Sequence, residues 1–186
     1  TIPASRINRV GQAMVNFYPA PNSADPVRNY FGNPSRKIEN SIPTGRIDQV
    51  LSSRDNLFGR VTLNSPQDRS PGQALAQSFP GFDSVQDDVN IQSSIGWTRI
   101  FSSTVVNELL AGYVRFRRDR ITQDSGRRNW LQELGIRGWT PDPMAWGAPA
   151  VQPSGYPEVG YSSNNAVLQW ITQSEQVSDN LSIIRN

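Results

Sequence analysis

The feature that most constrains the fold of this sequence is residues 89–120, in which two long arms flank the short polar turn Phe101–Thr104. Side chains alternate between the two faces of a strand, so apolar residues at alternate positions predict a strand with one apolar face. Such residues are Ile91, Ile95 and Trp97 in the first arm, and Leu109, Ala111 and Tyr113 in the second. Each arm has about a dozen residues, close to the ~9–11 that cross a bilayer at a tilt. The sequence therefore predicts a hairpin of unusually long antiparallel strands.

A shorter hairpin precedes this one along the chain. Its arms are residues 42–50 and 56–64, and its turn is residues 51–55. Both turns contain a Ser-Ser pair, Ser52-Ser53 and Ser102-Ser103, and the pairs lie 50 residues apart. This spacing indicates a repeated unit of hairpin, short turn and long loop.

Long loops and one more extended segment complete the strand region. Residues 65–88 and 119–165 are rich in Pro, Gly and charge and are expected to be loops, the second with a helical turn at 129–134 that Gly135 ends. Residues 167–185 are extended. Short turns at one end and long loops at the other are typical of a transmembrane β-barrel. We therefore expect an all-β fold, an antiparallel meander of about five long strands from such a barrel; a soluble all-β meander is the alternative.

The N-terminal part has a different pattern. Residues 4–17 predict a short helix, with Ser5 as its cap and the proline at position 19 beyond its end. Its apolar face consists of Ile7, Val10, Met14 and Phe17. The domain division expected from these patterns is a connector over residues 1–41 and a β-barrel segment over residues 42–186.

Composition excludes several kinds of chemistry. The 186 residues include no Cys and no His, which rules out disulfides, thiolate zinc sites and histidine-dependent catalytic triads. A net charge of +2 gives no indication of nucleic-acid binding. Nucleotide-binding and hydrolase motifs are absent, and the acidic pair Asp87-Asp88 is interpreted as solvated loop charge. We expect neither an enzyme nor a bound metal or cofactor.

Four blocks of the sequence are distinctive: IPASRINRVGQAMVNFYPAPN at residues 2–22, RIDQVLSSRDNLFGRVTL at 46–63, GWTRIFSSTVVNELLAGYVRFRRDR at 96–120 and QVSDNLSIIR at 176–185. They resemble TonB-dependent outer-membrane receptors of the Oar-like group, which contain a carboxypeptidase regulatory domain. The resemblance implies a plug-filled barrel in the bacterial outer membrane that imports a scarce siderophore, glycan or peptide. The chain would cover the exit from the plug and the first barrel strands, and TonB would contact the missing N-terminal part of the parent protein.

The second arm of the long hairpin departs from the pattern of these receptors. Leu110 and Val114 are apolar at positions where the lumen-facing side is normally polar. The sequence leaves open which face of this strand meets lipid.

Aromatic residues concentrate in the second long loop. On an external loop, such rings could stack on a sugar or an apolar ligand, which makes them candidate ligand-binding residues. The alternative is that they form a small core of the loop itself. The residues are Trp130, Trp139, Trp146, Tyr156 and Tyr161.

Basic residues mark the end of the second arm. If Leu109 and Tyr113 face lipid, Arg115 and Arg117 continue the same face where the strand leaves the membrane. Guanidinium groups at this height could bind the phosphates of lipopolysaccharide; the alternative is a solvated strand end paired with nearby acids. Trp97 and Tyr113 could belong to an interfacial aromatic girdle.

Ligand uptake is the function that these patterns favour. Three alternatives stay open at this stage: a soluble β-rich module that binds a glycan or a protein, a structural fragment that self-associates through open strand edges, and a hydrolase whose nucleophile uses Lys, Asp or Glu in place of His.

Overall fold

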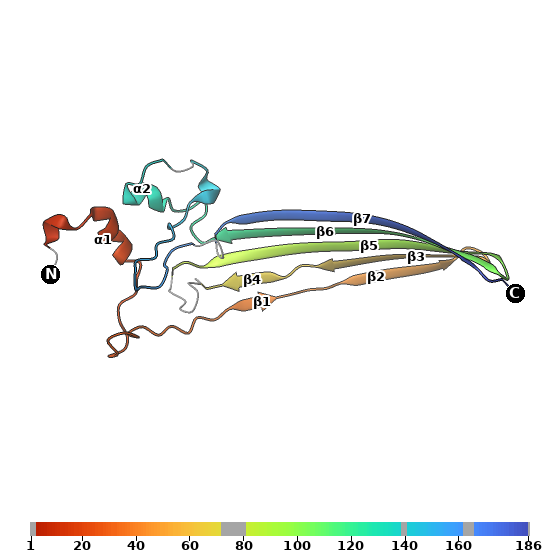
Figure 1. The fold of residues 1–186 in the computed structure, drawn as a ribbon, viewed down its shortest axis with the longest axis horizontal. Helices are drawn as coiled ribbons and strands as arrows, with labels where there is room; N and C mark the ends of the chain where they lie inside the picture. Colours follow the sequence, from red (N-terminus) through yellow and green to blue (C-terminus); the bar gives the residue numbers. More distant parts are fainter. Residues whose placement is uncertain (1–2, 72–80, 139–140, 162–165, 186) are drawn as a thin grey trace. The chain divides into compact units, whose positions relative to one another are not determined.

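The computed structural model describes residues 3–71, 81–138, 141–161 and 166–185. Its strands are β1 (Lys37–Glu39), β2 (Thr44–Val50), β3 (Asp55–Asn64), β4 (Gln67–Ser70), β5 (Ser84–Ser102), β6 (Val105–Thr122) and β7 (Leu168–Ile183). Its helical segments are η1 (Ala4–Arg6), α1 (Arg9–Val15), α2 (Trp130–Leu134) and η2 (Pro143–Ala145) (Figure 1).

The strands form one mostly antiparallel sheet. Its order is β1-β4-β5-β3-β2, with β6 paired to β5 and β7 paired to β6. Proline carbonyls continue the ladder beside the short strands: Leu63 N donates to Pro43 O at 3.0 Å, and Asp88 N donates to Pro66 O at 3.0 Å. A proline has no backbone N–H to donate to a strand ladder. Pro43 therefore separates β1 from β2, and Pro66 separates β4 from β3, whereas β5, β6 and β7 are long. The expected antiparallel meander is confirmed.

The chain divides into two compact units. The strand unit comprises residues 39–67, 87–118 and 169–186, and the loop unit comprises residues 1–38, 68–86 and 119–168. The N-terminal segment and the two long loops therefore belong to one unit. Whether residues 1–41 connect to a plug stays a prediction.

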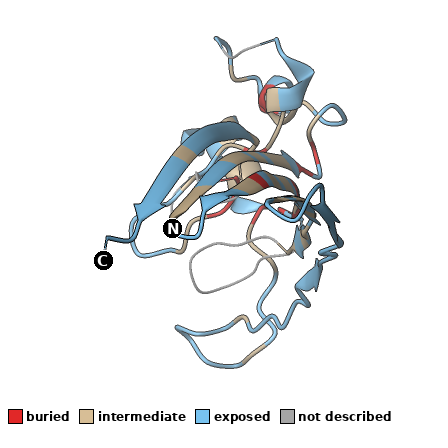
Figure 2. Ribbon diagram, turned by 90° about the vertical axis from the view of Figure 1, so that its right-hand side faces the viewer, coloured by how far each residue is buried: buried red, intermediate tan, exposed pale blue. Residues whose placement is uncertain are grey.

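In the strand unit, register separates an apolar face from a polar face. Leu57 pairs with Trp97, Gly59 with Ile95 and Leu63 with Ile91, while the intervening residues pair on the other side. Most of the strand surface is half-buried or exposed (Figure 2). The apolar face includes Ile47, Leu57, Val61, Leu63, Ile91, Ile95 and Trp97, and the polar face includes Thr44, Arg60, Thr62, Asn64, Asn90, Gln92 and Ser94.

Both hairpin turns are built in the same way. In the first turn Arg54 N donates to Ser52 Oγ at 3.1 Å, and in the second Thr104 N donates to Ser102 Oγ at 3.2 Å. A serine hydroxyl that binds the amide two residues on stabilises a tight turn. The first serine of each Ser-Ser pair thus has the same structural role.

The N-terminal helix begins later than the sequence predicted. Asn8, not Ser5, caps α1: its Oδ1 accepts from Val10 N at 2.8 Å and from Gly11 N at 3.3 Å. Asn8 has the extended backbone that an N-cap requires, whereas Ser5 lies inside the preceding turn η1.

Strand structure occupies part of both predicted long loops. β4 lies within residues 65–88, β5 already begins at Ser84, and β6 continues to Thr122. The predicted helical turn is α2, with Asn129 as its N-cap and Gly135 in the left-handed region at a φ of 72°. Among the described residues, no helix combines the length and apolarity needed to cross a membrane.

Candidate functional site

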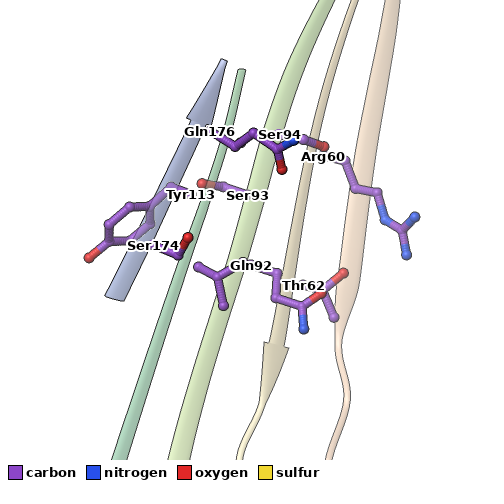
Figure 3. A pocket seen from close by; sticks show the side chains of 10 residues that line it. Arg60, Thr62, Gln92, Ser93, Ser94, Tyr113, Ser174 and Gln176 are labelled. Atoms are coloured by element: carbon purple, nitrogen blue, oxygen red, sulfur yellow. The ribbon is translucent and has the colours of Figure 1, made fainter. Parts of the chain in front are cut away.

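The polar face of the strand unit carries a shallow pocket of about 270 Å³. Hydroxyl and amide side chains from β3, β5 and β7 converge there (Figure 3). Such groups can exchange hydrogen bonds with water or a polar ligand without the cost of burying a charge. The residues that line it include Arg60, Thr62, Gln92, Ser94, Ser174 and Gln176.

An aromatic contact organises the polar face nearer the first turn. The ring of Phe58 lies over Gly96, where a Cβ would stand 2.1 Å from Phe58 Cε1. The Arg46 guanidinium lies 4.4 Å from the centre of the same ring and binds Asp48 through two hydrogen bonds of 2.7 and 2.6 Å. Gly96 is therefore required for Phe58 to lie flat on the sheet.

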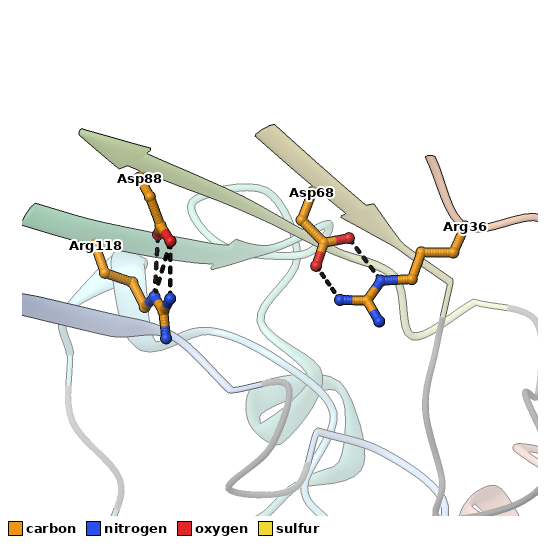
Figure 4. Close-up of polar contacts among 4 residues, drawn as sticks. All are labelled: Arg36, Asp68, Asp88 and Arg118. Atoms are coloured by element: carbon orange, nitrogen blue, oxygen red, sulfur yellow. Dashed lines mark hydrogen bonds and ion pairs between the residues drawn. The ribbon is translucent and has the colours of Figure 1, made fainter. Parts of the chain in front are cut away.

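Each unit also contains a bidentate ion pair (Figure 4). In the strand unit Arg118 binds Asp88, with Nη2 to Oδ2 at 2.8 Å, and in the loop unit Arg36 binds Asp68, with Nε to Oδ1 at 2.8 Å. The expectation that Asp87 and Asp88 are solvated loop charge is wrong for Asp88, which is buried within β5. Its burial is compatible with ionisation because Arg118 pairs with it.

The same ion pair settles the facing of β6. Because Asp88 and Arg118 meet side by side, the even-numbered residues of β6 share the face of the even-numbered residues of β5. Leu110 and Val114 therefore lie on the polar face, where they are 43% and 41% exposed. These two residues are apolar positions on a mostly polar face.

A small hydrophobic core holds the loop unit together. Edge-to-face contacts join Phe17 to Trp130 at 4.9 Å, Phe17 to Phe82 at 5.6 Å and Phe82 to Tyr161 at 5.7 Å. These rings come from the N-terminal segment and both long loops, so the three segments fold against one another. The buried residues of this core are Phe17, Phe82, Leu134, Ala148, Val159 and Tyr161.

A buried carboxylate anchors two of the candidate ligand-binding aromatics. Asp124 Oδ2 accepts from Trp130 Nε1 at 2.8 Å and from the Tyr161 hydroxyl at 3.1 Å. Burial, followed by the nearby charge of Asp124, raises the pKa of Tyr161 well above its ordinary value. Arg128 stacks 3.4 Å from the centre of the Trp130 ring. The polar edges of Trp130 and Tyr161 are thus already bound within the loop unit.

The other predicted aromatics have different environments. Trp146 is half-buried, and its Nε1 has no hydrogen-bond partner among the described residues. Tyr156 is 63% exposed. Trp139 lies outside the described residues.

Tyr156 lines a hollow of about 420 Å³ in the loop unit. The hollow lies between residues 18–30 and 155–157 and includes two more tyrosines, Tyr18 and Tyr30. Sequence reasoning missed it because its walls are 139 residues apart along the chain, as the hydrogen bond from Tyr18 to Pro157 O shows. The only local signal was the presence of two tyrosines and three prolines within residues 18–30.

Comparison with known proteins identifies the fold. Residues 1–186 match the family model of the outer membrane beta barrel domain. The chain belongs to this family. No curated protein and no solved structure matches it. Family membership confirms the expected bacterial outer-membrane location and favours a membrane barrel segment over a soluble meander. Proteins of the family are typically non-enzymatic.

Membership in the outer membrane beta barrel domain family assigns the two faces of the sheet. Such barrels turn an apolar band to lipid and a polar surface to the lumen. At the turn end of the apolar face, Asp55 accepts from Trp97 Nε1 at 3.3 Å, and Arg99 lies 3.5 Å from Asp55 and 5.3 Å from the centre of the Phe101 ring. A mixed cluster of rings and charges is the composition expected where such a barrel meets the membrane surface.

Arg115 and Arg117 continue the apolar face of β6 at the other end of the strand. They follow Leu109, Ala111 and Tyr113 at alternate positions. Arg115 is half-buried and makes no ion pair within the described part of the chain.

Proposed function

We propose that this outer membrane beta barrel segment is part of a TonB-dependent receptor that takes up a scarce ligand, of the siderophore, glycan or peptide class. In this receptor the short turns lie at the periplasmic end. TonB would deliver energy through the N-terminal part of the parent protein.

The observation that carries this proposal is the loop unit. Long loops with no internal core are poor ligand sites because ordering them on binding costs conformational entropy. Here three segments share the core of Phe17, Phe82 and Tyr161, and they leave an open hollow beside it. A preformed loop surface suits a receptor better than a passive structural barrel.

Uptake by the full-length parent protein tests the proposal. Cells that contain or lack the protein are given a panel of labelled siderophores, oligosaccharides and peptides, with and without TonB. We expect accumulation of one class that needs both the protein and TonB. Equal accumulation of every class in cells without the protein would exclude a role in uptake.

A second proposal concerns the membrane around the barrel. Arg115 and Arg117 are positioned to bind lipopolysaccharide phosphates, since both follow the lipid-facing row of β6 and Arg115 has no ion-pair partner among the described residues. Arginine suits phosphate binding because its planar guanidinium group can donate two hydrogen bonds to one phosphate.

A further inference from the structure

We propose that the hollow between residues 18–30 and 155–157 binds an acidic sugar, a pyranose ring that carries a carboxylate. This inference rests on the proposed uptake function and deepens it, because it names the chemistry of the ligand. The volume of about 420 Å³ falls within the ~300–1,000 Å³ of typical ligand pockets.

Tyrosine rings form the walls of the hollow. The rings of Tyr18 and Tyr156 meet edge to face, with centroids 5.9 Å apart and planes at 63°. Tyr156 keeps 63% of its surface exposed, so one ring face is open to a ligand. A pyranose has C–H faces that pack on an aromatic ring and hydroxyls at its edge that suit the tyrosine O–H.

The walls are fixed before any ligand arrives. The Tyr18 hydroxyl donates to Pro157 O at 2.7 Å and joins the two sides of the hollow. Asn22 closes the loop that carries the remaining wall: its Nδ2 donates to Phe31 O at 2.7 Å, and its Oδ1 accepts from Phe31 N at 2.8 Å. A rigid site loses less conformational entropy on binding than a flexible one.

A free positive charge lines the hollow. Arg28 is exposed and makes no ion pair within the described residues. The neighbouring carboxylate of Asp25 is occupied by backbone, since its Oδ1 accepts from Val27 N at 2.8 Å and from Arg28 N at 2.7 Å. Asn29 adds a side-chain amide to the lining. A guanidinium beside aromatic rings binds a carboxylate through two parallel hydrogen bonds.

The main competing ligand is a proline-rich peptide. Aromatic grooves bind such peptides in many proteins, and prolines 19, 21, 26 and 157 add apolar surface here. A proline-rich peptide would leave Arg28 unused, whereas an acidic sugar uses both the rings and the charge. This difference favours the sugar as the ligand, and the experiment therefore compares an acidic sugar with a proline-rich peptide.

The experiment measures binding to the full-length receptor in detergent micelles by calorimetry. The probes are tetragalacturonate, its methyl ester and a proline-rich decapeptide. We expect the acid to bind about tenfold more tightly than the ester, the ratio that one charge-assisted contact supplies. Arg28→Gln should bring this ratio close to one, and Tyr156→Ala should weaken the binding of both sugars about tenfold or more.

Two control variants match the test residues. Phe31 is 63% exposed like Tyr156, and its side chain does not line the hollow. Phe31→Ala keeps the backbone bonds to Asn22 and should leave both sugar affinities unchanged. Arg127→Gln removes an exposed arginine of the same unit that lies away from the hollow and should also have no effect.

Three outcomes would overturn the inference: equal affinity for acid and ester, unchanged binding by both test variants, or binding of the peptide alone. These outcomes differ from a failure of the uptake function. If Arg28→Gln and Tyr156→Ala change sugar binding as expected while cells accumulate no ligand, the binding site is supported and the uptake function is not. If TonB-dependent uptake persists in both variants, uptake stands and the site fails.

Discussion

Arg118 holds the carboxylate of Asp88 with two hydrogen bonds, 3.0 Å from Nε to Oδ1 and 2.8 Å from Nη2 to Oδ2. Asp88 is only 6% exposed, while Arg118 is 33% exposed. We predict that Arg118→Leu destabilises the barrel by about 3 kcal/mol, because it removes the bidentate arginine partner of a buried carboxylate. The urea midpoint of the heat-modifiable band on gels measures this loss.

Two further variants separate pairing from packing. Adding Asp88→Asn to Arg118→Leu should recover part of the loss, since the buried charge is then gone. Arg46→Leu breaks a pair whose members are both exposed and should shift the midpoint much less. Equal shifts for Arg118→Leu and Arg46→Leu would show that the burial of Asp88 has no energetic consequence.

Gly96 is the position on the polar face where a side chain is least tolerated. In Gly96→Ala the new Cβ would stand 2.1 Å from Phe58 Cε1 and 2.7 Å from Cζ, so the ring must leave its place under Arg46. We expect a destabilisation of about 1–3 kcal/mol, the usual range for overpacking. The measurement is again the urea midpoint, and Phe58→Ala in the same chain should remove the effect of Gly96→Ala.

Gly59 supplies the matched control for Gly96. It lies on β3, and a Cβ there meets no atom within 4 Å. Gly59→Ala should therefore leave the urea midpoint almost unchanged. A loss as large as that of Gly96→Ala would mean that the contact with Phe58 does not decide the result at Gly96.

The sequence predicted what depends on local pattern. The alternation of apolar residues predicted the strand arms, the polar turns predicted the hairpins, and Asn129 with Gly135 predicted α2. Each of these signals lies within a short stretch of sequence. Serine is among the preferred cap residues, so the sequence predicts Ser5 as the cap, whereas the extended backbone of Asn8 puts the cap of α1 there.

The contacts that build the candidate sites were not predictable in the same way. Asp88 and Arg118 are 30 residues apart, and Tyr18 and Pro157 are 139 apart. Periodicity gives the face of each residue on its own strand, but it does not fix which residue of another segment lies opposite. For this reason Trp130 and Tyr161, both candidates for ligand binding by composition, proved to share a buried carboxylate.

The raised pKa of Tyr161 predicts a pH dependence of the loop unit. Tyr161 stays neutral in the folded unit, whereas its unfolded form ionises near the ordinary value of 10.0. The contribution of Tyr161 to the free energy of unfolding is therefore complete below pH 10. It is lost as the pH rises further, by up to about 1.4 kcal/mol per pH unit. Tryptophan fluorescence during unfolding at pH 8 to 12 measures it.

Phenylalanine variants isolate the tyrosine responsible. Tyr161→Phe should remove most of the slope above pH 10, since it deletes the ionisable group but keeps the ring against Phe82. Tyr156→Phe should leave the slope intact because Tyr156 is exposed. A slope that survives Tyr161→Phe would assign the alkaline transition to other groups.

Arg115 and Arg117, near the end of β6, give the last prediction. Changing Arg115 and Arg117 together to Ser should lower the amount of lipopolysaccharide that co-purifies with the full-length protein by about tenfold. Each substitution removes a guanidinium group that can bind a phosphate through two hydrogen bonds. A phosphate assay of the detergent-purified protein measures this amount. Arg60→Ser is the control: Arg60 lies on the polar face, opposite the lipid row, and its loss should leave the lipid content unchanged. If all variants retain equal amounts of lipopolysaccharide, Arg115 and Arg117 are solvated residues at the end of β6 and do not bind lipopolysaccharide.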